Sequence, residues 1–163
     1  MRVRRATRED LLGIARVADA AQWATYGDLL SPVTIEAMLR RDFSPGALRR
    51  RLLSGGMLVA ETDEGQIVGF GHGVVTEGAI HLAALATDPE VRRRGVGSSL
   101  LRAIRDLDPS LPICADVLLG NEDGERFYEA AGFVPGEILQ ATIVGEPLVE
   151  RRWWLSAAWV AAG

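Results

Sequence analysis

The stretch TDPEVRRRGVGSSLL, residues 87–101, decides the fold, because it joins a strand to a helix through a loop suited to an anion. Three arginines occupy the loop, and Gly95 and Gly97 lead from them into an amphipathic helix. The first N–H groups of a helix have no partner inside the helix, and the helix dipole is positive at that end. Glycines let the backbone approach a ligand closely, and arginines donate charge-assisted hydrogen bonds to phosphate oxygens. The segment therefore predicts a phosphate or pyrophosphate site.

Two other phosphate-binding loops do not fit this segment. The dinucleotide-binding fingerprint needs a third glycine three residues after Gly97, and that position is Leu100. The P-loop needs a lysine after its last glycine, and residues 87–101 contain no lysine. The alternative interpretation of the segment alone is an ordinary turn with solvated arginines before a surface helix.

A second segment, NEDGERFYEAAGF at residues 121–133, has the marks of a capped helix. Asn121 is a favourable N-cap, and the two acidic residues after it suit the positive end of the helix dipole. Gly132 stands where a helix commonly ends in a left-handed glycine, and Phe133 begins a new apolar stretch. We therefore expect a helix over 121–131.

Together these segments resemble the GNAT superfamily of acyl-coenzyme A-dependent N-acyltransferases. Arg92-x-x-Gly95-x-Gly97 is similar to that family's pyrophosphate loop, and Asn121 with Phe127-Tyr128-Glu129 and Gly132-Phe133 is similar to its second cofactor motif. The resemblance is specific over residues 80–133, looser over 3–75 and weak beyond 136. It implies an α/β (α+β) fold: a mixed, mostly antiparallel sheet of about seven strands, splayed into a V at the cofactor site, with helices on both faces.

The resemblance also implies acetyl-CoA (coenzyme A) as the cofactor. Backbone groups of the strand before the loop are expected to pair with the pantetheine arm as an added strand would. Core packing of Leu85 is compatible with that role. The expected coenzyme A ligands are Leu85, Ala86, Thr87, Arg92, Arg93, Arg94, Gly95, Val96, Gly97, Ser98, Asn121, Phe127 and Tyr128.

The implied reaction is direct attack of a neutral amine on the thioester, which needs a base, an acid for the leaving thiolate and donors for the oxyanion. Tyr128 matches the family's motif tyrosine and is the candidate acid, because a phenol can protonate a thiolate. The alternative is that Tyr128 only packs and hydrogen-bonds the sulfur.

His81 is the candidate base. It lies on the strand that carries a catalytic glutamate in several family members, and imidazole has a suitable intrinsic pKa. Strand alternation predicts that it shares a face with Ala83 and Leu85. A buried, hydrogen-bonded core histidine is the alternative interpretation. Other candidates are a water chain without a single base and the side chains of His72, Glu77 and Asp116.

Residues 22–31 break the preceding helical pattern at Gly27 and match the place where the family builds its acceptor wall. Trp23, Tyr26 and Asp28 are the candidate substrate-binding residues, because aromatic faces and a carboxylate hold cations. Covering the core is an equally reasonable role for them. Three tryptophans near the C-terminus are candidates for the cleft, the end of the sheet or a dimer contact: Trp153, Trp154 and Trp159.

Composition limits the possible classes of function. A length of 163 residues predicts one domain, 1–163, and 48% hydrophobic residues suffice for a sizeable core. The net charge of −4 argues against a nucleic-acid partner. A single cysteine, Cys114, excludes an intrachain disulfide and fits a reducing compartment. The N-terminus has no apolar signal-peptide region and no apolar run reaches the roughly 18 residues of a membrane span, so we expect a cytoplasmic protein without a membrane partner.

The pattern of apolar residues predicts the remaining elements. Strands are expected at 3–6, 57–61, 67–75, 79–86 and 112–118, with a closing hairpin of 138–144 and 148–155; helices are expected at 11–18, 32–39, 47–53 and after Gly97. The predicted function is N-acetyl transfer to a primary amine of a small molecule or peptide, with no metal. An inactive acyl-CoA-binding regulatory or assembly module is the alternative, which thiol release with amines would distinguish. The acceptor's identity and a homodimer are left open.

Overall fold

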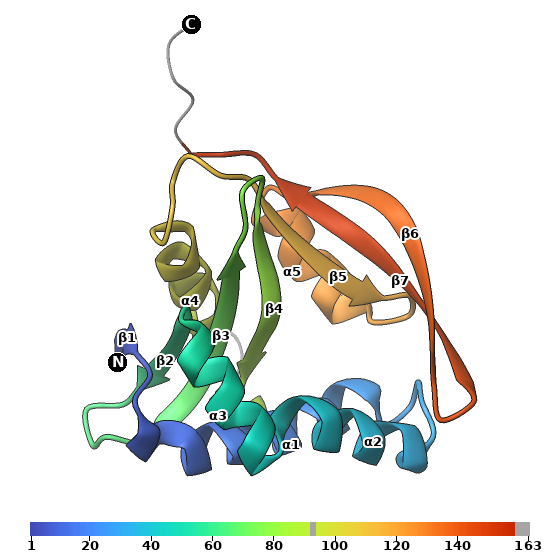
Figure 1. Cartoon of the computed structure of the whole chain (residues 1–163), viewed down its shortest axis with the longest axis horizontal. Coiled ribbons are helices and arrows are strands. Elements are labelled where there is room, and N and C mark those ends of the chain that lie inside the picture. The colour runs from blue at the N-terminus through green and yellow to red at the C-terminus, as the bar shows by residue number, and fades with distance from the viewer. Residues whose placement is uncertain (92–93, 159–163) are drawn as a thin grey trace, which may run out of the picture.

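The computed structural model describes residues 1–91 and 94–158, in which seven strands form one sheet (Figure 1). The strand order is β1-β2-β3-β4-β5-β7-β6, and every neighbouring pair is antiparallel except β4 and β5. The strands are β1 (Arg2–Arg5), β2 (Met57–Glu61), β3 (Ile67–Val75), β4 (Ile80–Thr87), β5 (Ile113–Leu118), β6 (Val134–Ile143) and β7 (Glu146–Leu155). The helices are α1 (Leu11–Tyr26), α2 (Pro32–Phe43), α3 (Pro45–Ser54), α4 (Val96–Arg105) and α5 (Glu122–Ala130), with short 3₁₀ turns η1 (Arg8–Asp10) and η2 (Pro89–Val91). The expected mixed, mostly antiparallel seven-stranded sheet is confirmed.

Helices cover both faces of the sheet because strand residues alternate between two cores. On one face, Leu100 and Ile104 of α4 pack against strand residues such as Leu58. On the other face, α1 and α3 pack against Val59 and Phe70. Neighbouring residues of β2 thus belong to opposite cores, which fixes the register of the strand.

Two serine–proline pairs start consecutive helices. The Ser31 hydroxyl accepts a hydrogen bond from the Thr34 N–H at 3.4 Å and begins α2, and Ser44 caps α3 in the same way. Proline at the first helical position lacks only an N–H that would have no helical partner. Asn121 caps α5 as predicted, with its Oδ1 3.0 Å from the Gly124 nitrogen.

Several expected boundaries are wrong. Residues 22–26 are helical, because the sequence between Ala18 and Gly27 contains no helix breaker and Gly27 itself closes the last turn by donating to the Trp23 carbonyl. Strand β6 begins at Val134, not at residue 138. Pro135 is tolerated there because β6 is the edge of the sheet, where a missing N–H costs no ladder hydrogen bond.

The sheet divides between β4 and β5. These parallel strands are paired only at Ile80 with Ile113 and His81 with Cys114, and beyond that point they diverge (Figure 1). Strand β4 keeps its pairing with β3 as far as Thr87. One edge of β4, over residues 82–87, therefore has no neighbouring strand in the described part of the chain.

A bulge in β4 also changes which side chains share a face. His72 of β3 lies opposite Ala84 and Gly73 lies opposite Leu82, so Ala83 is an extra residue in the ladder. Leu82 and Leu85 consequently pack toward the same core beside α4. The predicted shared face of His81 and Leu85 is wrong, because strict alternation ends at this bulge.

Candidate active site

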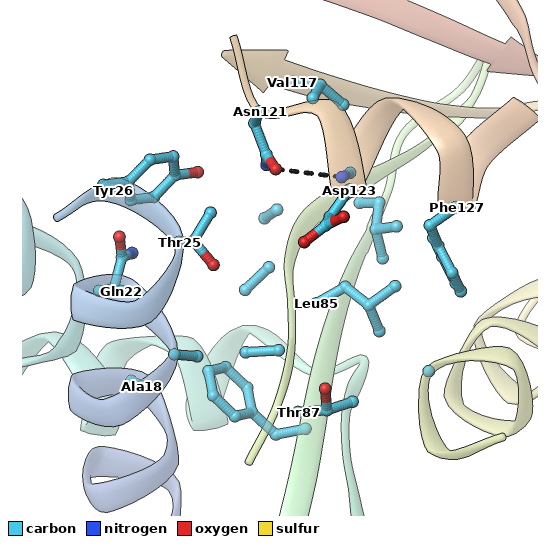
Figure 2. A pocket seen from close by; sticks show the side chains of 18 of the residues that line it. Ala18, Gln22, Thr25, Tyr26, Leu85, Thr87, Val117, Asn121, Asp123 and Phe127 are labelled. Atoms are coloured by element: carbon cyan, nitrogen blue, oxygen red, sulfur yellow. Dashed lines mark hydrogen bonds between the residues drawn. The ribbon is translucent and has the colours of Figure 1, made fainter. Parts of the chain in front are cut away.

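The divergence of β4 and β5 opens a cavity of about 800 Å³ (Figure 2). Strand β4 forms its floor, the N-terminus of α4 and one side of α5 form one wall, and the end of α1 forms another. Figure 2 shows Thr25 and Tyr26 of α1 on one side of the opening and Asn121 and Asp123 on the other, with Leu85 and Thr87 of β4 below Asp123 in this view. Lining residues from the more distant elements are Met38, Arg41, Asp42, Phe43, Arg51, Asp116, Val117 and Glu150.

The start of α4 borders this cavity and presents free backbone donors. Gly95 has a φ of +78°, and the first helical hydrogen bond runs from the Ser99 N–H to the Gly95 carbonyl. The N–H groups of residues 96–98 come before that bond, so the helix supplies no carbonyl for them. Arg94 is exposed beside this loop, whereas the predicted ligands Arg92 and Arg93 lie outside the described residues. The described part of the loop can hold an anion.

Gly97 packs closely against α5. A Cβ at this residue would lie 3.3 Å from Cε2 of Phe127, and both residues line the cavity. Close packing, not an unusual φ, therefore explains glycine at this position.

Asp88 anchors the loop to the rest of the fold. Its buried carboxylate accepts hydrogen bonds from the Glu90 N–H and from Nη1 of Arg16, both at 3.0 Å. These two bonds hold the pKa of Asp88 below its ordinary value. Arg16 also donates to the carbonyl of Ile67, which ties the loop to α1 and β3. This anchor was not predicted from the sequence.

Tyr128 lies on α5 with its ring held by two edge-to-face contacts. The ring centroids of Phe127 and Phe133 are 5.1 and 5.0 Å away. Burial, with a smaller effect of Tyr26, raises the pKa of Tyr128 well above the ordinary value of a phenol. The hydroxyl therefore stays protonated at neutral pH and is available as a donor at the cavity.

The two histidines lie outside the residues that line the cavity. Nδ1 of His81 is 3.3 Å from Sγ of Cys114, a buried thiol whose pKa is raised by burial. His72 is buried, with Nδ1 2.9 Å from Nη1 of Arg51 and Nε2 3.1 Å from the Gly55 carbonyl. Burial and the Arg51 charge lower the pKa of His72, so it holds Arg51 as a neutral acceptor.

Of the other two candidate bases, Glu77 lies away from the cavity and Asp116 lies on it but is paired. Glu77 is exposed in the turn between β3 and β4. Asp116 lines the cavity, but its carboxylate is paired with Arg152, with Nε–Oδ1 and Nη2–Oδ2 distances of 2.7 and 3.0 Å.

Only one of the three predicted acceptor residues lies on the cavity. Tyr26 lines it, whereas Trp23 and Asp28 are outside its lining. Gln22 and Thr25 of α1 line it instead. Both lie within about one helical turn of Tyr26, so extending the helical pattern through Tyr26 would have indicated them.

Glu150 is a further lining residue that was not predicted from the sequence. It lies on β7 opposite Leu118 of β5, and its side chain is partly buried. Burial, then Asp116, raises the pKa of its carboxyl group, against a lowering by Arg41 and Arg152. No local motif marks this residue, because only the β5–β7 pairing brings it to the cavity.

Two further properties concern the described residues. No helix among them is long and apolar enough to cross a membrane. They also contain no cluster of three or more histidine, cysteine, aspartate or glutamate side chains arranged to hold a metal ion.

Comparison with known proteins places this arrangement among acetyltransferases. Residues 54–135 match the family model described as an acetyltransferase (GNAT) domain. The mycothiol acetyltransferase of Kytococcus sedentarius is 33% identical over 120 residues, which are 73% of this chain and 35% of that protein. The chain thus matches about a third of the length of this relative.

Two solved structures have the same fold over nearly the whole chain. A GCN5-related N-acetyltransferase from Rhodopseudomonas palustris superposes with a TM-score of 0.79 at 23% identity, covering 95% of this chain and 94% of that one. The PaiA N-acetyltransferase from Thermoplasma acidophilum, solved in complex with coenzyme A, has a TM-score of 0.76 at 23% identity, covering 92% and 96%.

Proposed function

Because the chain belongs to the GNAT acetyltransferase family, we propose that it transfers an acetyl group from acetyl-CoA to a primary amine of a small molecule or peptide. The transfer is a direct attack within a ternary complex, and residues 1–163 act as one acyltransferase unit. The observation that carries the proposal is the single cavity that joins the open edge of β4, the N-terminus of α4 and Tyr128.

The shape of this cavity suits coenzyme A. The edge of β4 over residues 82–87 offers backbone groups to the amides of the pantetheine arm, as a sheet edge does to an added strand. The N–H groups of residues 96–98 face the place for the pyrophosphate, with Arg94 near it and Arg92 and Arg93 as further expected ligands. Gly97 lets the start of α4 pack closely on α5, since a Cβ there would already lie 3.3 Å from Cε2 of Phe127.

The chemistry that the bound thioester supplies is an activated acyl carbon. The amine nitrogen forms a bond to this carbon, and the carbon–sulfur bond breaks. Tyr128 holds the proton that the leaving sulfur needs, because burial keeps its hydroxyl protonated. Tyr26, Gln22 and Thr25 form the wall from which the amine approaches.

Thiol release from acetyl-CoA, measured with a panel of amines, tests this function. The panel contains benzylamine, spermidine, glucosamine and a tripeptide with a free α-amine, and mass spectrometry follows each acetylated product. We expect amine-dependent thiol release and a stoichiometric N-acetyl product with at least one amine. Coenzyme A binding by calorimetry with no thiol release for any amine would instead favour a binding or regulatory module.

A further inference from the structure

We propose that the Glu150 carboxylate binds the acceptor as a primary ammonium ion and takes the proton that its nitrogen must lose before attack. This inference deepens the proposed function and rests on it, because it concerns the same cavity. It assigns the base to β7, on the opposite side of the sheet opening from the strand that carries His81.

The sheet register places Glu150 on the reacting side of the cavity. Glu150 lies opposite Leu118, and two residues further along β7, Arg152 lies opposite Asp116. Residues two apart on a strand share a face, so Glu150 lies on the same face as the cavity-lining Asp116. This face continues the wall opened by the divergence of β5 from β4.

Glu150 lacks a cationic partner in the described part of the chain, although two arginines are near. Arg152 donates both of its bonds to Asp116. Arg41 is held by Asp42, with Nε–Oδ1 and Nη2–Oδ2 distances of 2.9 and 2.8 Å. A partly buried carboxylate is stabilised less without a cationic partner than with one. An ammonium ion on the acceptor would supply that cationic partner.

The neighbouring groups connect Glu150 electrostatically to the candidate acid. Burial, with a smaller effect of the Glu150 charge, raises the pKa of Tyr26, and burial, with a smaller effect of Tyr26, raises the pKa of Tyr128. Both hydroxyls consequently stay protonated while Glu150 is the group that accepts. A carboxyl group whose pKa is raised is also the better proton acceptor near neutral pH.

The ammonium ion gives one proton to Glu150, and the neutral nitrogen forms a bond to the acyl carbon. The carbon–sulfur bond breaks, and the sulfur takes the hydroxyl proton of Tyr128. The second nitrogen proton restores Tyr128, and Glu150 releases its proton to solvent. The net products are the amide, the thiol and one proton.

The variant Glu150→Gln tests this role because it keeps the shape and removes the proton acceptor. We expect kcat/KM for the best amine of the panel to fall about 10²-fold or more, the usual effect of losing a positioned base. Coenzyme A affinity by calorimetry and the thermal unfolding midpoint should stay at the wild-type values. Glu64→Gln is the matched control, since it removes the same charge from an exposed turn far from the cavity.

The pH profile separates a base from a structural role. The charged and titratable groups around Glu150 are Asp116, Arg152, Arg41 and Tyr26, and Asp116 and the arginines shift its titration in opposite directions. The wild type should lose kcat/KM as the pH falls and Glu150 is protonated, at a pH independent of the pKa of the amine. Two amines of different pKa test that independence. The acid limb should disappear in Glu150→Gln.

The remaining outcomes decide against the role of Glu150 alone or against both proposals. Wild-type kcat/KM in Glu150→Gln, or a slow variant that keeps the wild-type acid limb, overturns the role of Glu150 and leaves the proposed function standing. A wild-type chain that releases no thiol with any amine overturns both. If Glu150→Gln does not fold, Glu150→Asp is measured under the same criteria, with a lower rate and a displaced acid limb expected.

Discussion

At the residue scale, Tyr128 provides the clearest test of the chemistry. Tyr128→Phe removes one hydroxyl and keeps the ring contacts with Phe127 and Phe133. We expect kcat to fall about 10²-fold, the usual effect of losing a positioned acid. Calorimetry should show nearly unchanged acetyl-CoA affinity, because the ring still fills its place. A wild-type kcat in this variant would reduce Tyr128 to a packing residue.

His72 gives a second prediction at this scale, through stability. The pKa of His72 is lower in the folded chain than in the unfolded one. As the pH falls, the folded chain therefore binds fewer protons at this residue than the unfolded chain does. The stability it contributes is complete above an unfolded pKa of about 6.5 and is lost as the pH falls below that value. His72→Gln should flatten the pH dependence of the unfolding midpoint between pH 7 and 5, because glutamine can still accept from Arg51 without being protonated. An unchanged slope in this variant would assign the dependence to other groups.

Sequence patterns locate only those site residues that belong to a local motif. Gly95, Gly97 and Tyr128 all lie on the cavity because they are part of two continuous segments that fold locally. Glu150 and Arg51 come to the same cavity from a distant strand and helix, so no spacing in the chain indicates them.

At the element scale, the contact between α4 and α5 determines access to the phosphate end of the cavity. Gly97→Val would place methyl groups where a Cβ alone is already 3.3 Å from the Phe127 ring. We expect coenzyme A affinity to fall about tenfold, in line with an overpacking cost of about 1–3 kcal/mol. Gly65→Ala is the control, since Gly65 has a φ of +85° in a turn with open space around it. It should lower stability without changing the affinity measured by calorimetry, and an unchanged affinity in Gly97→Val would contradict the placement of the pyrophosphate.

Element boundaries followed from a capping residue where the prediction rested on one. Asn121 marks a helix start that the structure confirms, whereas the Ser44 cap starts α3 at Pro45 and not at the expected residue 47. The bulge at Ala83 has no such mark, because it depends on the pairing of β4 with β3. Its consequence is that His81 does not share the face of Leu85, while the contact of His81 with Cys114 follows from the β4–β5 register.

At the scale of the whole molecule, the two halves of the cavity are also joined at the far end of the sheet opening. The hairpin of β6 and β7 reaches the start of α2, where Oε1 of Glu146 accepts from the Ser31 N–H and hydroxyl at 3.1 and 3.0 Å (Figure 1). Glu146→Ala should therefore loosen this wall and raise the KM of the amine more than it changes kcat. Steady-state kinetics with the best amine of the panel measures both values, and an unchanged KM would show that the contact does not shape the acceptor site.

The N-terminal strand is fastened by a charge network that makes the whole fold sensitive to acid. Nη1 of Arg4 lies 2.8 Å from Oδ2 of Asp10, and its Nη2 lies 3.0 Å from Oε2 of Glu61, which joins β1, η1 and β2. Hydrogen bonds from Arg4 lower the pKa of Asp10, and those from Arg4 and Arg2 lower the pKa of Glu61 to about 2. Both carboxyl groups thus bind protons more weakly in the folded chain than in the unfolded one. The stability that these two carboxylates contribute to the folded chain is present above their unfolded pKa values of about 4. It is lost as the pH falls toward 2.

Arg4→Met tests this network. At pH 7 it should lower the free energy of unfolding by about 1–3 kcal/mol, because Asp10 loses its charged donor. The fall in the unfolding midpoint between pH 5 and 2.5, followed by circular dichroism, should become shallower than in the wild type. Arg2→Met is the control, since Arg2 is exposed and, among the described residues, its guanidinium pairs with Glu61 alone. Arg2→Met keeps both Arg4 contacts and should keep most of the wild-type dependence of the unfolding midpoint on pH. If Arg4→Met and the wild type show equal pH dependence, the acid sensitivity belongs to other carboxyl groups, such as Asp88.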